Sequence, residues 1–142
     1  MIEKIINKKK LLSIIIRANY KSEGIKFFTP NDFSQQLGYM NRPKGYSIAP
    51  HNHNKVKREV LTTDETLIIK SGKVRIDFYD EKKKYLKSKI LKKGDVILLV
   101  NGGHGFEMLE KTEIIEIKQG PYAHDKDKTR FESVKKNKIK IK

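Results

Sequence analysis

Residues 65–80, ETLIIKSGKVRIDFYD, decide the fold class of this chain. Two apolar runs are joined by Ser71 and Gly72, a turn signal typical of a hairpin. The second run alternates strictly, with Val74, Ile76 and Phe78 on one face and Arg75, Asp77 and Tyr79 on the other. Because successive side chains of a strand point to opposite faces, this alternation predicts a β-strand with one apolar face.

The same signals recur along the chain on both sides of this hairpin. Polar or glycine-rich turns (DEKKK, KKGD, NGGHG) separate further apolar runs, and Gly120-Pro121 follows the last of them. Turn signals about every 8–12 residues predict an all-β sandwich or barrel. Upstream, residues 11–28 predict strands, and residues 29–40 (TPNDFSQQLGYM) predict one short helix or turn, of which we expect the helix.

The chain has the length of one domain. Its 142 residues suffice for one hydrophobic core. We therefore expect a single domain over residues 1–142, with its core in about residues 40–120. The tail, residues 133–142, is basic and predicts either a frayed end or a short edge strand.

Composition excludes several classes of site. The chain has no cysteine, which excludes disulfides, thiolate metal sites and cysteine nucleophiles. Its apolar N-terminal run, LLSIII, is shorter than the core of a secretory signal, and no run approaches the ~20 residues that span a bilayer. We expect a cytoplasmic protein without a membrane partner.

The chain carries a net charge of +15, which raises the question of nucleic acid. Lysine supplies most of this charge and is scattered along the sequence, whereas base readout relies on arginine and single-strand binding on aromatic platforms. We interpret the charge as a basic surface and expect no nucleic-acid partner. An anionic small-molecule substrate fits the same charge.

Two of the four histidines, His51 and His53, are separated by one residue. In an extended segment, residues i and i+2 point to the same side, so both imidazoles can reach one metal ion. His104 follows a predicted strand in the glycine-rich stretch NGGHG and can supply a third ligand from elsewhere in the fold. Taken singly, each could also be an ordinary surface or loop histidine.

These residues resemble the two signatures of the cupin superfamily. Gly-x5-His-x-His followed by Glu-x6-Gly is matched at Gly45, His51, His53, Glu65 and Gly72. The stretch from Gly94 to His104 is similar to the second signature, with Val100 where a proline is usual. The resemblance covers roughly residues 40–120. It implies a double-stranded β-helix, or jelly-roll, barrel that binds a divalent metal ion through His51, His53, Glu65 and His104.

The carboxylate of this ligand set stays open. Eleven residues separate His53 from Glu65, a longer interval than is usual in the superfamily, and Glu59 lies nearer to the histidines. The matching interval to Gly72 favours Glu65, and Glu107 is a weaker candidate. The ligand set suits Fe, Mn, Ni or Zn without selecting among them.

Small cupins that this chain resembles include isomerases and epimerases of sugars and nucleotide sugars in surface-polysaccharide pathways. The resemblance implies a metal-dependent enzyme of that kind, in which Glu65, Glu59 or Tyr122 moves a proton. The alternative is a non-catalytic cupin that binds or senses a small ligand. The segment GPYAHDKDKTRF, with His124, Asp125 and Arg130, is expected to close over the mouth of the barrel. Pairing of sheet edges, with LLSIII as one candidate, predicts a homodimer.

Overall fold

The computed structural model of the chain describes the backbone of residues 1–142 and every side chain except that of Asp125. Ten strands and two short 3-10 helices form, and no α-helix occurs in the backbone described. The elements are β1 (Ile2–Asn7), β2 (Lys10–Ile16), β3 (Gly24–Phe27), β4 (Gly38–Asn41), β5 (Glu65–Ser71), β6 (Lys73–Tyr79), β7 (Tyr85–Lys92), β8 (Val96–Leu99), β9 (Gly103–Met108), β10 (Glu113–Lys118), η1 (His124–Asp127) and η2 (Lys136–Lys138). The all-β prediction is confirmed.

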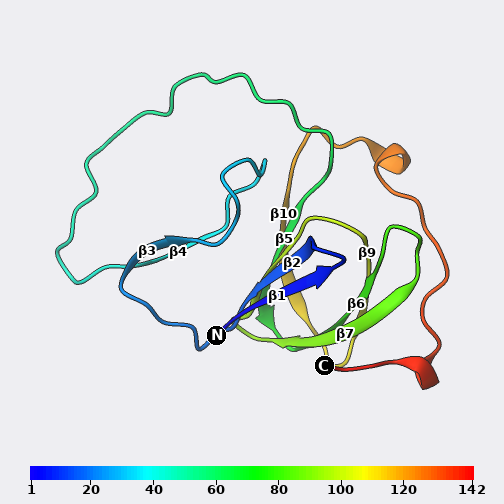
Figure 1. The fold of residues 1–142 in the computed structure, drawn as a ribbon. Helices are drawn as coiled ribbons and strands as arrows, with labels where there is room; N and C mark the ends of the chain where they lie inside the picture. Colours follow the sequence, from blue (N-terminus) through cyan, green and yellow to red (C-terminus); the bar gives the residue numbers. More distant parts are fainter.

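Two antiparallel sheets face each other as a β-sandwich (Figure 1). One has the order β1-β2-β8-β5-β10 and the other the order β7-β6-β9. The hairpin predicted for residues 65–80 is wrong, because β5 belongs to the first sheet and β6 to the second, and the two strands do not pair with each other. The turn at Ser71 and Gly72 instead carries the chain from one sheet to the other. A closed jelly-roll barrel is a finer prediction and stays one, since β9 and β10 are end strands in the described pairing.

The core lies between the two sheets and draws on both. Buried side chains from the first sheet are Ile5, Leu12, Ile15, Leu67, Ile69, Ile97 and Leu99, and those from the second are Val74, Ile76, Phe78 and Leu91. The apolar face predicted for residues 74–78 is therefore confirmed. Alternation directs these side chains inward, except in β2, where the register with β1 shifts at Leu12, three residues before Ile15.

The opposite face of β6 is also buried, which the alternation alone does not predict. The exposed fractions of Arg75 and Asp77 are 8% and 4%. Two guanidinium nitrogens of Arg75 donate to Asp77, and the Ser88 hydroxyl donates to the same carboxylate. The basic tail is tied to this region, since the Ser88 amide donates to the Lys140 carbonyl and Ser88 forms a parallel bridge with Ile141.

The prediction of a short helix in residues 29–40 is wrong. Turns and bends occupy most of residues 31–36, and residues 38–41 form β4. Side chains satisfy the loop backbone here: Gln36 donates to the carbonyls of Pro30 and Phe33, and the Leu37 amide donates to the Thr29 hydroxyl. Such side-chain bonds offer the backbone an alternative to helical bonds.

The position of residues 11–16, LLSIII, bears on the prediction that this run pairs with a second subunit. Residues 11–16, LLSIII, lie within β2, which pairs with β1 on one side and β8 on the other. That run therefore has no open edge for a second subunit. No helix in the described backbone has the length and apolarity needed to cross a membrane.

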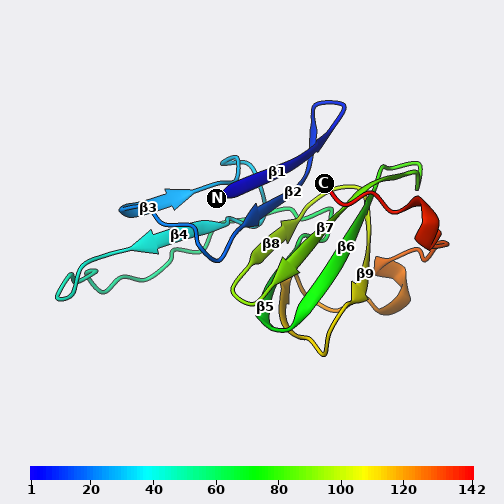
Figure 2. The same cartoon turned by 90° about the horizontal axis from the view of Figure 1, so that it is seen from below.

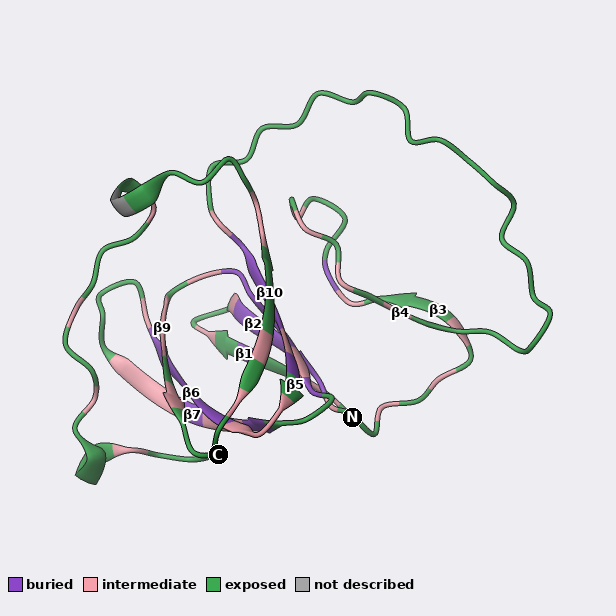
Figure 3. Ribbon diagram, turned by 180° about the vertical axis from the view of Figure 1, so that it is seen from behind, coloured by how far each residue is buried: buried purple, intermediate pink, exposed green. Residues whose placement is uncertain are grey.

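An arm leaves the sandwich between β2 and β5. Strands β3 and β4 pair with each other in a separate two-stranded sheet, which projects from the body in Figure 2. Residues 42–62, here called the strap, contain no helix or strand and arch away from the sheets (Figure 1). Figure 3 shows the strap as exposed throughout. The predicted ligands His51 and His53 lie on this strap.

Candidate functional site

A carboxylate and an imidazole meet where the two sheets come together. Glu65 begins β5 and precedes the inward-facing Leu67 by two residues, so its side chain also points between the sheets. His104 on β9 lies opposite the buried Phe78, which places it on the inner face of the other sheet. The Nε2 atom of His104 lies 2.9 Å from Oε2 of Glu65. The structure thus brings together two of the four predicted ligands.

Strand β10 adds a lysine to this pair. Lys118 lies opposite Glu65 in the register, and its Nζ is 4.0 Å from Glu65 Oε1 and 3.4 Å from Glu116 Oε1. Glu116 and Lys118 share the inner face, as the two-residue period predicts. Ile115 and Ile117 share the outer face, where each is 49% exposed.

The surroundings keep Glu65 ionised. The hydrogen bond from His104 lowers the pKa of the Glu65 carboxyl, and the charges of His104, Lys118 and Lys128 act in the same direction against the opposing effect of burial. The neighbouring carboxyl behaves oppositely, since burial raises the pKa of Asp64 despite hydrogen bonds from Ser34 and Gln119. The carboxyl pKa values of the neighbours Asp64 and Glu65 are thus shifted in opposite directions.

A pocket of about 690 Å³ opens beside Glu65 and His104. Its other walls come from residues 61–63, 102–105 and 126–131, and from Tyr79 and Ser133. Near the C-terminus, the lining includes three cationic side chains and one carboxylate. These are Lys126, Lys128, Arg130 and Asp127, and Thr129, Phe131 and Ser133 complete this wall. Of the segment 120–131, which was expected to close over the mouth, residues 126–131 line this pocket. The side chain of Asp125 is outside the described set.

The glycines before His104 make room for protein rather than for a ligand. Gly102 has a φ of +72°, and a Cβ there would lie 2.4 Å from the Tyr79 carbonyl oxygen. A Cβ on Gly103 would lie 2.7 Å from the ring of Phe131. That ring packs edge-on against Tyr79, with ring centroids 5.0 Å apart. The glycine-rich loop allows this close packing, which holds residue 131 at the pocket wall.

His51 and His53 lie apart from this pocket. Both are exposed on the strap, their ring centroids are 5.2 Å apart, and Nδ1 of His51 is 3.0 Å from the Ala49 carbonyl oxygen. Among the described side chains, no group of three or more histidines or carboxylates is placed to hold a metal ion. The predicted four-residue ligand set does not fit a metal in this conformation.

The other two candidate proton carriers lie at the margins. Glu59 is an exposed strap residue that lines a separate hollow of about 240 Å³ with Ser34 and Val100. Tyr122 is 64% exposed, and its ring lies against that of His124, 4.8 Å between centroids. It lines a hollow of about 200 Å³ that shares Thr63 and Asp127 with the main pocket. Only Glu65, of the three residues proposed to move a proton, touches His104.

Sequence reasoning missed several residues of the pocket. Lys128 and Phe131 come from the segment after the last strand, where no periodicity indicates which side chains point inward. Tyr79 was placed on the outer face by strict alternation, yet it lines the pocket. Tyr79 keeps that face, because an added Cβ on its partner Gly103 would lie 3.3 Å from its own Cβ. Alternation therefore gives the face of Tyr79 correctly, but not its place at the pocket.

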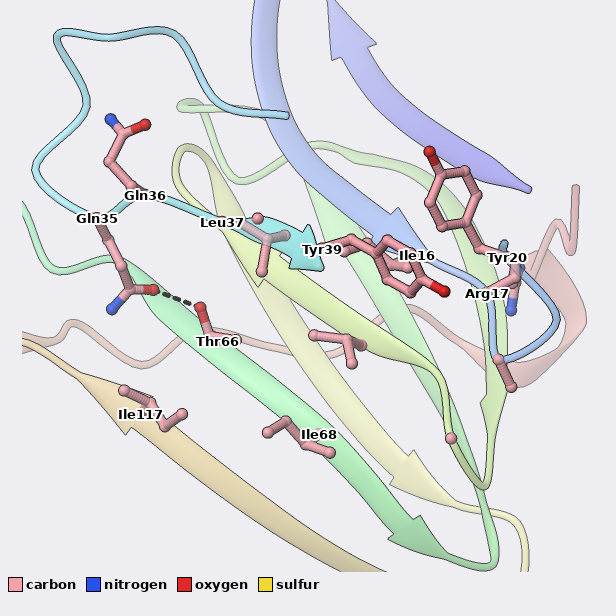
Figure 4. A pocket seen from close by; sticks show the side chains of 14 residues that line it. Ile16, Arg17, Tyr20, Gln35, Gln36, Leu37, Tyr39, Thr66, Ile68 and Ile117 are labelled. Carbon is pink, nitrogen blue, oxygen red and sulfur yellow. Dashed lines mark hydrogen bonds between the residues drawn. The ribbon is translucent and has the colours of Figure 1, made fainter. Parts of the chain in front are cut away.

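A second hollow, of about 490 Å³, lies on the outer face of the five-stranded sheet (Figure 4). Leu37 and Tyr39 lie over Ile68, Ile117 and neighbouring residues, and the Thr66 hydroxyl donates to Gln35 at one end. The lining contains no carboxylate, histidine or lysine.

Comparison with models of protein families, with curated proteins and with solved structures finds no match to this chain.

Proposed function

We propose that the protein binds an anionic small molecule in the pocket beside Glu65 and His104 and transfers protons on it. The observation that carries this proposal is the 2.9 Å contact between Glu65 Oε2 and His104 Nε2 at the wall of a polar pocket of about 690 Å³. A carboxylate hydrogen-bonded to an imidazole is a common arrangement in general acid-base catalysis.

The two groups have separate roles in this proposal. Glu65 is ionised at neutral pH because its pKa is lowered, so it orients the His104 ring and stabilises the positive charge that forms when the imidazole takes a proton. His104 is the residue that exchanges a proton with the substrate. Glu65 is thus the orienting partner, and no step is assigned to Glu59 or Tyr122.

The rim of the pocket supports an anionic substrate. Lys126, Lys128 and Arg130 line it, and Lys118 lies beside Glu65. Cationic side chains around a pocket favour phosphate or carboxylate groups. Together with the resemblance to cupins, this supports a sugar or nucleotide sugar as substrate and isomerisation or epimerisation in polysaccharide biosynthesis as the reaction class.

The test is deuterium exchange. Full-length protein is incubated in D₂O with a panel of nucleotide-linked and phosphorylated keto sugars, and NMR follows exchange at the carbon next to the carbonyl. We expect exchange with the wild type and its loss in His104→Gln, with Glu65→Gln reduced at least tenfold. Lys82→Ala, in the exposed turn between β6 and β7, serves as the control.

Three other outcomes of this exchange experiment would change the proposal. Ligand binding by the wild type without exchange would support the non-catalytic alternative, a small-ligand-binding or sensory protein. Absence of both binding and exchange across the panel would contradict the substrate class. Exchange that persists in His104→Gln would show that another residue moves the proton.

Metal binding remains a separate prediction, on which no step above depends. Elemental analysis of the purified protein, followed by titration with Fe, Mn, Ni and Zn, tests it directly. We expect uptake of one of these ions by the wild type and weaker uptake by His51→Ala, His53→Ala and His104→Ala. No uptake by the wild type would contradict the prediction.

We also propose that nucleic acid is not a partner, although the charge is +15. Binding to DNA or RNA through phosphate contacts would weaken steeply as salt rises. Measurement of binding at low and at physiological salt tests this. Tight, salt-sensitive binding would contradict the proposal.

A further inference from the structure

The arm formed by β3 and β4 has an apolar face that stays exposed in the described structure. Ile25 is paired with Met40 and Phe27 with Gly38, so Ile25, Phe27 and Met40 lie on one side of the arm. Their exposed fractions are 44%, 59% and 49%. The ring of Phe27 lies across Gly38 on this side, 2.9 Å from the place of an added Cβ. These three side chains form one surface, here called the arm face.

The opposite side of the arm rests on the sandwich. Tyr39 and Leu37 lie over Ile68 and Ile117 at the hollow on the outer face of the five-stranded sheet (Figure 4). The ring of Tyr20 packs edge-on against Tyr39, with ring centroids 5.0 Å apart. A two-stranded hairpin is only marginally stable alone, and an apolar sheet face is normally buried against another layer. The arm therefore has a layer on one side and needs one on the other.

The described chain also exposes more surface than a rounded monomer of its mass. Its accessible surface is 10726 Å², whereas a monomeric protein of 16.6 kDa exposes about 7,600 Å². The arm and the strap stand away from the body, as Figures 1 and 2 show. The difference of about 3,000 Å² exceeds the ~800 Å² that each partner buries in a standard interface. The chain therefore has enough unburied surface for a stable dimer.

The apolar part of this surface is also large enough. Beside the arm face, the Arg42 guanidinium lies 4.5 Å from the ring centroid of Tyr46, and Tyr46 and Ile48 are 52% and 54% exposed. At about 200 Å² for a side chain of this size, five half-exposed side chains leave roughly 500 Å² of apolar surface in water. A standard interface needs about 450 Å² of apolar surface from each partner. The arm face, Tyr46 and Ile48 meet that need.

We infer that the arm face packs against the same face of a second copy about a two-fold axis. Such a contact joins identical patches and is therefore self-complementary. The two hairpins would stack face to face at about 10 Å, as packed sheets do. The run LLSIII lies inside its sheet, so the arm takes the role in dimer formation that was expected of that run.

The charges of the arm permit this contact although the chain carries +15. Lys26 lies opposite Tyr39 in the register and points to the other side of the arm. The arm face itself consists of Ile25, Phe27 and Met40. The centre of the contact therefore contains no pair of like charges, which would otherwise oppose it.

The inference concerns assembly and does not depend on the proposed reaction, so its first test is mass in solution. Sedimentation of the full chain is measured over a concentration series up to about 50 µM in about 0.15 M salt. We expect a dimer for the wild type and a dissociation constant raised about 100-fold or more in Met40→Glu. Glutamate lowers the net positive charge, so this loss could not come from added repulsion between whole molecules.

The matched control is Ile6→Glu on β1, because Ile6 is 54% exposed and the change in charge is the same. We expect this variant to dimerise like the wild type, with folding of each variant checked by circular dichroism. A monomeric wild type throughout the series would overturn the inference and leave the strap of the same chain as the cover. A dimer that persists in Met40→Glu would overturn it as well, and dissociation by Ile115→Glu instead would place the contact on β10.

Cross-linking guards against a variant that fails to fold, and the chain has no cysteine of its own. Single-cysteine variants Ile25→Cys, Phe27→Cys and Met40→Cys are treated with a bismaleimide that spans about 10 Å, the spacing of stacked sheets. A two-fold axis through the arm face brings each of these residues near its own copy. We expect covalent dimers in at least one of them, about tenfold or more above Ile6→Cys. Equal cross-linking in all four variants, or none in the three arm variants, would overturn the inference.

Discussion

Glu65 and His104 join the two sheets of the sandwich through a contact of 2.9 Å between Oε2 and Nε2. One residue belongs to β5 and the other to β9, and the chain between them passes through β6, β7 and β8. The contact therefore depends on the assembled sandwich and cannot form in an isolated hairpin. It is both the centre of the proposed site and a link between the sheets.

The acid stability of the fold should depend on this contact. Because the folded-state pKa of Glu65 lies below its ordinary value of 4.5, its contribution is complete above that pH and is lost as the pH falls through the lowered value. Asp64 acts in the opposite direction, because its raised pKa favours folding as the carboxyl becomes protonated. We expect Glu65→Gln to flatten the acid loss of unfolding free energy and Asp64→Asn to steepen it. Urea denaturation between pH 3 and pH 7 measures both, and equal slopes in all three proteins would contradict this account.

Asp95 should be the most sensitive carboxylate for stability. It is 1% exposed and accepts hydrogen bonds from Arg17 Nη1 (2.8 Å), the Ala18 amide (2.8 Å) and the Lys92 amide (3.1 Å). Removal of one partner from a buried ion pair costs about 3–5 kcal/mol. We expect Asp95→Ala to lose unfolding free energy of that size, measured by chemical denaturation, and Asp95→Asn to lose less.

A matched control for Asp95 is Glu81. Its ion pair with Lys10 is exposed, so Glu81→Ala should change stability by no more than about 0.5 kcal/mol. A similar loss in both variants would mean that burial does not govern the effect.

Gly72 in the β5–β6 turn should not tolerate a side chain. Its φ is +78°, and an added Cβ would lie 2.2 Å from the Lys111 carbonyl oxygen. The left-handed backbone and the collision together predict a loss of roughly 2–5 kcal/mol for Gly72→Ala in thermal or chemical denaturation. Gly45 has a similar φ of +85° with nothing within 4 Å, so Gly45→Ala should lose at most about 1–2 kcal/mol. Equal losses of stability in the two variants would show that the structure shifts to make room for the Cβ at residue 72.

Lys128 should contribute to binding of an anionic ligand. It lines the pocket, and its charge contributes to the lowered pKa of Glu65. An exposed cation adds up to about 1 kcal/mol to an ion pair, so Lys128→Ala should weaken binding about twofold to fivefold, less at high salt. Titration calorimetry with the best ligand of the exchange panel measures this against Lys82→Ala. An unchanged affinity in Lys128→Ala would place the anionic group elsewhere.

Much of the fold could be predicted from local pattern. The alternation of Val74, Ile76 and Phe78 identifies the buried face of β6 because a strand has a fixed two-residue period. The burial of Arg75 and Asp77 could not be predicted in this way. It depends on ion pairing and on the tail near Ser88, which are tertiary features with no period.

The site was predictable only in part for a similar reason. Glu65 and His104 were named from motif spacing, and strand direction brings them together. The position of His51 and His53 depends on the strap, whose sequence contains exposed apolar residues but no element that fixes its course. The helix expected near residue 33 failed because Gln36 and Thr29 bond to the backbone and stabilise turns instead.

The half-exposed Ile115 and Ile117 connect the basic charge of the chain to self-association. They lie on β10, an end strand whose edge is free to pair with a copy of itself in the described fold. At +15, two molecules repel one another at long range, and this repulsion fades as salt shortens the Debye length. We therefore predict that any pairing of two copies along β10 increases as the salt concentration rises.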